Sequence, residues 1–108
     1  MNGNEYIVFY SADNGKIGAA VMKKGFFRYN VRYNSTIPFA NIDNYEFRFG
    51  TFRENKWIFW GVIYDTSIKE INIEGMSVNI LDTEYPFSVC YLIGDGSPQE
   101  IPEYKIIY

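Results

Sequence analysis

Short apolar runs that alternate with turn residues recur along the whole chain, and this pattern constrains the fold more than any other feature of the sequence. Each run is bounded by Gly, Asn, Asp or Pro, as strands joined by turns require. An apolar stripe at helical spacing, sustained over three turns, occurs nowhere. About nine short strands without helices between them predict antiparallel pairing. We therefore expect an all-β fold, an antiparallel two-sheet β-sandwich, with a small β-barrel as the alternative.

The segment from 26 to 33 shows the clearest period of two. Aromatic and apolar residues fall on one predicted face and polar residues on the other. The first set is Phe27, Tyr29, Val31 and Tyr33, and the second is Arg28, Asn30 and Arg32. We expect the first face to be buried and the second to be exposed. The segment from 34 to 44, which contains Pro38, is expected to be the longest connection.

The segment from 57 to 64 is apolar on both faces, which is typical of a central strand with both sides covered. Within it, Phe59 and Val62 are expected to be deeply buried. Trp57 and Trp60 fall on opposite faces by parity, so one of them lies on an outer face. That side chain is either covered by a loop or exposed as a platform for sugar rings or a partner protein.

The size and composition of the chain fit one folded unit. Its 108 residues correspond to a single all-β domain over residues 1–108. Hydrophobic residues make up 47% and aromatic residues 19%, which is ample material for a core. The net charge of −3 argues against a general nucleic-acid binder, whose domain would normally be basic.

The chain contains no His and one Cys, and this excludes much of the common catalytic chemistry. An internal disulfide, a Ser-His-Asp or Cys-His arrangement and a Cys/His zinc site are all impossible. We expect no enzymatic activity, no cofactor and no metal site. The alternative is a small carboxylate-dependent hydrolase acting on a cell-wall or sugar substrate, because that chemistry needs no His. Asp65 is then the best candidate, since a nearby apolar wall could raise its pKa, although residues 65–67 also fit a polar turn.

Charge is unevenly distributed along the sequence. From Asn14 to Ile42 there are five basic residues and no acid, whereas the segment from Asp65 to Tyr108 is acidic. The bases either are solvated charges, or pair with the acidic half, or form a site for an anionic partner. That partner would be an anionic polymer, a lipid headgroup or an acidic protein surface. The candidate ligand-binding residues are Lys23, Lys24, Arg28, Arg32 and Trp60.

Four stretches resemble a group of small exported or lipid-anchored domains of Gram-positive, Bacillus-like bacteria. They are Ile7-Val8-Phe9-Tyr10, the segment from Ile17 to Phe27, the segment from Trp60 to Asp65 followed by Ile68-Lys69-Glu70-Ile71, and Tyr104-Lys105-Ile106-Ile107-Tyr108. That group often has Gly followed by Trp where this chain has Arg28 and Tyr29. The group has no established activity, so the resemblance implies an extracytoplasmic domain and supplies no mechanism.

The amino end carries neither a charged region nor an apolar run typical of a signal segment, and no stretch is long and apolar enough for a membrane span. We expect an extracellular or cell-surface protein whose signal segment has been removed, and otherwise a cytoplasmic one. The function expected from the sequence is a non-enzymatic extracytoplasmic binding or interaction module.

Overall fold

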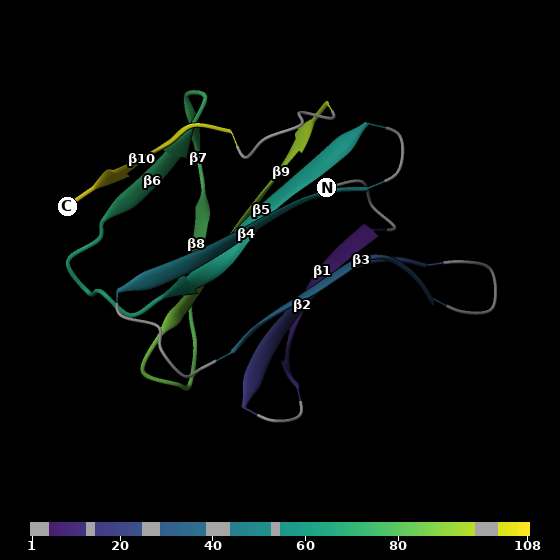
Figure 1. Ribbon diagram of the computed structural model, residues 1–108, viewed down its shortest axis with the longest axis horizontal. Coiled ribbons are helices and arrows are strands. Elements are labelled where there is room, and N and C mark those ends of the chain that lie inside the picture. Colours follow the sequence, from purple (N-terminus) through teal and green to yellow (C-terminus); the bar gives the residue numbers. More distant parts are fainter. Residues whose placement is uncertain (1–4, 13–14, 25–28, 39–43, 53–54, 97–101) are drawn as a thin grey trace.

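In the computed structural model, the strand and turn pattern of the sequence becomes ten antiparallel strands in three sheets within the described residues (Figure 1). The structure describes residues 5–12, 15–24, 29–38, 44–52, 55–96 and 102–108, and these contain no helix. The first sheet has the order β1-β2-β3 and consists of β1 (Glu5–Ala12), β2 (Lys16–Lys24) and β3 (Tyr29–Pro38). The central sheet has the order β4-β5-β9-β8 and consists of β4 (Tyr45–Phe52), β5 (Lys56–Ile63), β9 (Ser88–Asp95) and β8 (Asn79–Asp82). The third sheet has the order β10-β6-β7 and consists of β10 (Tyr104–Ile107), β6 (Glu70–Ile73) and β7 (Met76–Ser77).

The central sheet is covered on both faces, so the molecule has two hydrophobic cores. One core lies between the first sheet and the central sheet, and it contains Val21, Ile37, Trp60 and Val62. The other core lies between the central sheet and the third sheet. In Figure 1 the first sheet and the third sheet stand at opposite ends of the picture, with β4 and β5 between them.

Strand β5 supplies side chains to both cores, as its apolar pattern predicts. Every residue from Trp57 to Ile63 is buried. Ile58, Trp60 and Val62 belong to the first core, and Trp57, Phe59 and Ile63 belong to the second. Phe59 and Val62 are 0% exposed, which confirms the prediction of deep burial. Burial of this much apolar surface makes β5 a large contributor to hydrophobic stabilisation.

The third sheet is the main difference from the two-sheet arrangement that we expected. Glu74 and Gly75 both have positive φ, 51° and 81°, so they form the tight hairpin turn that the sequence predicts between β6 and β7. The chain then leaves this sheet at Val78, whose N–H donates to the Ile71 carbonyl at 2.8 Å, and enters the central sheet as β8. The extended segment from β7 to β8 thus contributes one strand to the third sheet and one to the central sheet. The all-β, antiparallel sandwich is confirmed, and the three sheets are open in the described part of the chain.

Strand β3 is longer than expected, because it continues to Pro38 where the sequence predicts a connection. Ile37 pairs with Ile17 of β2 and is 0% exposed. Burial of this side chain holds residues 34–38 in the sheet. Pro38 is tolerated because β3 is an edge strand, where a missing N–H leaves no ladder bond unmade. The remaining part of the predicted connection includes residues 39–43, which lie outside the described residues.

Candidate functional site

The basic residues expected to bind an anion lie on β2 and β3 of the first sheet. Lys23 is partly buried and Arg32 is exposed. Lys24 is in β2, where its backbone pairs with Tyr29, and its side chain lies outside the described part of the structure. Arg28 also lies outside the described residues. The structure therefore brings Lys23 and Arg32 onto neighbouring strands, and the positions of the Lys24 and Arg28 side chains are not described.

The predicted alternation of β3 is broken by a β-bulge. Val21 pairs with Tyr33, and Met22 pairs with Val31, so Arg32 is an extra residue on β3. Tyr33 consequently packs against the first core, whereas Val31 faces away from it and is 59% exposed. The prediction that Val31 and Tyr33 share a buried face is wrong, because the bulge moves them to opposite faces of the sheet.

The outer face of the first sheet carries a row of apolar side chains that the sequence analysis did not identify. Tyr6 pairs with Met22, which in turn pairs with Val31, so the row crosses all three strands. Tyr6 is 44% exposed and Val8 40% exposed. An open hollow of about 400 Å³ is lined by Tyr6, Ile7, Val8 and Met22. We call Tyr6, Val8, Met22 and Val31 the outer apolar face.

A signal for this face was present in the sequence. Residues 6–10 of β1 are apolar or aromatic at every position, as in β5, so both faces of β1 carry such side chains. Ile7 and Phe9 pack against the first core, and Tyr6 and Val8 point the other way. In β5 the second face is covered by another sheet, whereas Tyr6 and Val8 remain exposed. Such clustered exposed apolar side chains mark interaction surfaces.

Both tryptophans are covered, so Trp60 is a core residue in this structure. Trp60 is 0% exposed, and its Nε1–H donates to the Tyr33 hydroxyl at 3.3 Å. Trp57 is 2% exposed, and its Nε1–H donates to the Asp95 carbonyl at 3.0 Å. Of the two alternatives open for the outward tryptophan, the covered one is realised, because the third sheet packs over the second face of β5. Trp60 offers no surface to a ligand.

Two ion pairs lie within the described residues, and neither involves the predicted anion-binding bases. Arg48 pairs with Glu46 at 3.1 Å on β4, and Lys56 pairs with Asp95. In the described part of the chain, strand β3 forms its ladder with β2. Pairing of the bases with the acidic carboxy-terminal half stays a prediction, because the side chains of Lys24 and Arg28 lie outside the described part of the structure.

Asp65 forms the polar turn that the sequence allowed. The Ser67 hydroxyl donates to Asp65 Oδ1 at 2.5 Å, and the Ser67 N–H donates to the same oxygen at 2.9 Å. These two bonds, led by the hydroxyl bond, hold the pKa of the Asp65 carboxyl below its usual value. The expectation that an apolar wall raises this pKa is wrong, because the bonded carboxylate is favoured over the acid. Asp65 thus lacks the raised pKa of a general acid.

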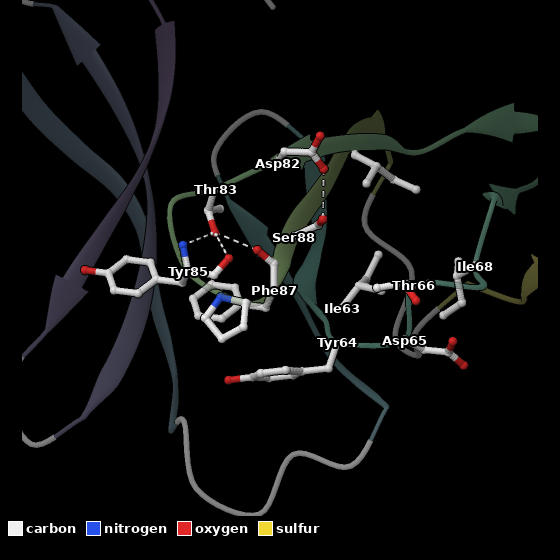
Figure 2. A pocket seen from close by; sticks show the side chains of 12 residues that line it. Ile63, Tyr64, Asp65, Thr66, Ile68, Asp82, Thr83, Tyr85, Phe87 and Ser88 are labelled. Carbon is white, nitrogen blue, oxygen red and sulfur yellow. Dashed lines mark hydrogen bonds between the residues drawn. The ribbon is translucent and has the colours of Figure 1, made fainter.

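An open hollow of about 530 Å³ brings Asp65 near a second carboxylate, that of Asp82. Asp82 accepts a bond from the Ser88 hydroxyl at 3.2 Å, and Figure 2 shows that the two carboxylates do not point toward one another. Tyr64 and Phe87 also line the hollow, with ring centroids 5.4 Å apart. The arrangement offers hydrogen-bond acceptors beside aromatic rings, and it lacks the convergent acid pair that glycoside hydrolysis uses.

Cys90 is buried in β9 and is 0% exposed. Burial raises the pKa of its thiol to about 12, against a smaller opposing effect of a backbone bond from Gly61. Almost no thiolate is present near neutral pH, so the reactive form is scarce as well as inaccessible.

The described residues contain no cluster of three or more His, Cys, Asp or Glu side chains that could hold a metal ion. No helix in the described part of the structure is long and apolar enough to cross a membrane.

Comparison with protein-family models, with curated proteins and with solved structures gave no match. The resemblance to exported domains of Gram-positive bacteria therefore stays a prediction.

Proposed function

We propose that the protein is a non-enzymatic binding module whose first sheet docks on an anionic lipid surface. The observation that carries this proposal is the outer apolar face, which crosses β1, β2 and β3 in one row. Seven large hydrophobic residues are exposed in the described part of the chain, and three of them, Tyr6, Val8 and Val31, lie on this face. The others are spread over β7, β8, the segment before β9 and the carboxy-terminal residue.

Charge complementarity supports an anionic partner. The segment from Asn14 to Ile42, which spans β2 and β3, contains five bases and no acid. The acidic residues of the second half are spread over β6, β8, β9 and the β6–β7 turn among other places, and Glu84 lines a hollow together with Phe9 and Tyr10 of β1. The bases of β2 and β3 favour the approach of this sheet to a negative surface, and the attraction weakens as salt rises.

The combination of apolar and basic side chains favours a lipid interface over a purely anionic polymer. A polymer of charged or hydroxylated units offers no apolar surface on which the side chains of Val8 and Val31 could pack. At a bilayer interface, Tyr and aliphatic side chains enter the boundary between headgroups and acyl chains, and Lys and Arg contact the phosphates. Location outside the cytoplasm rests on the family resemblance alone.

A carboxylate-dependent hydrolase has less support. It would need one carboxyl group with a raised pKa, and hydrogen bonds from Ser67 lower that of Asp65. The binding module requires no proton transfer, and it uses exposed apolar side chains that the structure describes, Tyr6, Val8 and Val31.

Binding to vesicles tests the proposal. We expect the protein to sediment with vesicles of phosphatidylcholine and phosphatidylglycerol at about 0.01 M salt, and to be released at about 1 M salt, where the screening length is about 3 Å. The double variant Lys23→Ser/Arg32→Ser should bind roughly tenfold more weakly or worse, since each base near such a surface contributes about 1 kcal/mol. Its stability should change little, because Arg32 is exposed and Lys23 is only partly buried.

The matched control is Lys69→Ser/Lys105→Ser, which also removes two charges, both from exposed positions at the other end of the molecule. This variant should bind vesicles as the original chain does. Equal weakening by both double variants would show that net charge alone matters. Sedimentation with pure phosphatidylcholine at both salt concentrations would also refute an anionic partner.

A further inference from the structure

In the described part of the chain, six strands lie at the edges of the three sheets, and five of them carry features that oppose pairing with another chain. Strand β3 has a bulge, exposed Arg32 and terminal Pro38. Strand β4 carries the charged side chains of Arg48 and Glu46. Strands β7, β8 and β10 are only two, four and four residues long.

Strand β1 has one charged residue, Glu5 at its first position, and it has no bulge and no Pro. It is eight residues long, and from Tyr6 to Ala12 it contains no charged residue, no Pro and no Gly. Its ladder in the described structure is formed with β2 on one side only. An edge that is long, apolar and free of charge is a template for an added strand. The contrast with the other five edges indicates that the free side of β1 is used.

We propose that β1 pairs antiparallel with β1 of a second copy of this chain, forming a two-fold symmetric dimer. A two-fold axis beside Val8 places Tyr6 opposite Tyr10 of the second copy and Ile7 opposite its Phe9. Glu5 then faces Ser11, so no like charges meet across the pair. Each copy offers and receives the same surface, as a symmetric dimer requires.

The side chains beside this edge favour a second copy over a charged partner strand. Residues 6–12 offer a partner no charge to pair with, and β1 itself is a strand of matching apolar character. The hollow lined by Tyr6, Ile7, Val8 and Met22 lies along the same edge, where it can receive a side chain from the added strand. Pairing would join two three-stranded sheets into one of six strands with a continuous outer apolar face.

Analytical ultracentrifugation tests the dimer. Between about 1 μM and about 1 mM protein, we expect the mass to rise from 12.6 kDa toward twice that value. Because the one charged residue of β1, Glu5, faces Ser11 of the second copy and no ion pair forms across the edge, this association should persist in high salt, unlike the vesicle binding proposed above. Amide hydrogen exchange in residues 6–12 should slow as the protein concentration rises, while exchange in β10 stays unchanged.

The decisive variant is Val8→Lys, which places a charge in the middle of the β1 edge at a position that is already 40% exposed. It should raise the dissociation constant at least about tenfold. The control is Val31→Lys, an identical change on the same face at the opposite edge, which should leave the dimer intact. A chain that stays monomeric throughout, a Val8→Lys dimer of unchanged affinity, or equal loss in both variants would each overturn the proposal. If a variant fails to fold, the dimer is still tested by the original chain, in which amide hydrogen exchange of residues 6–12 should slow as the protein concentration rises.

Discussion

Replacement of Phe59 by Ala is expected to lower the free energy of unfolding by about 3–5 kcal/mol. Phe59 is 0% exposed and lies between two rings that come from different sheets. Its ring centroid is 4.8 Å from that of Phe47 on β4 and 5.6 Å from that of Tyr104 on β10. Truncation leaves a cavity in the second core, and the surrounding strands, fixed by their ladders, cannot close it.

Chemical denaturation followed by circular dichroism measures this loss. The control is Leu81→Ala on β8 of the same sheet, where the side chain is 45% exposed, and the expected change is within about 0.5 kcal/mol. An unchanged midpoint for Phe59→Ala would show that β10 and the third sheet do not pack on β5 as described.

Replacement of Trp60 by Ala is expected to cost a similar amount, about 3–5 kcal/mol, through the first core. The Trp60 ring lies 6.2 Å from that of Phe9 on β1, and its Nε1–H donates to the Tyr33 hydroxyl on β3. The side chain therefore joins the first sheet to the central sheet, and its loss removes packing between these two sheets and one hydrogen bond.

The same variant separates a structural role of Trp60 from a binding role. Trp60 is covered, so protein that remains folded should still bind anionic vesicles with nearly the original affinity. A variant of unchanged stability with lost binding would place Trp60 in a ligand site, against the burial described here.

The sequence was most informative where a strand pattern is local. The doubly apolar segment of β5 predicted burial on both sides, and Glu74-Gly75 predicted the tight turn, because each depends only on nearby residues. The sequence was least informative where the outcome depends on a partner strand. The bulge at Arg32 reverses the expected face of Val31, and it arises from the register of β3 on β2.

The candidate site likewise combines a feature that the local sequence shows with one that depends on how the strands pair. The basic segment could be recognised from composition, but the outer apolar face depends on the alignment of Tyr6, Met22 and Val31 across three strands. Likewise, two sheets were expected because no local feature shows that the segment around Val78 passes from one sheet to another. The pKa of Asp65 was misjudged because its hydrogen bonds with Ser67 outweigh the effect of the neighbouring apolar residues.

Docking of the first sheet on an anionic bilayer is tested most directly by a fluorescent label on that sheet. Cys90 is buried with a raised pKa, so a cysteine introduced by Val31→Cys can be labelled selectively with an environment-sensitive dye. The unsubstituted chain, treated in the same way, should take up almost no dye. A second control carries the label at Leu81→Cys, on β8 of the central sheet.

On addition of vesicles containing phosphatidylglycerol at low salt, emission from the label at position 31 should shift to shorter wavelength, and high salt should reverse the shift. The label at position 81 should report an aqueous environment throughout. A shift at position 81 without one at position 31, or no shift at either position while the protein sediments with the vesicles, would contradict docking through the β1-β2-β3 sheet.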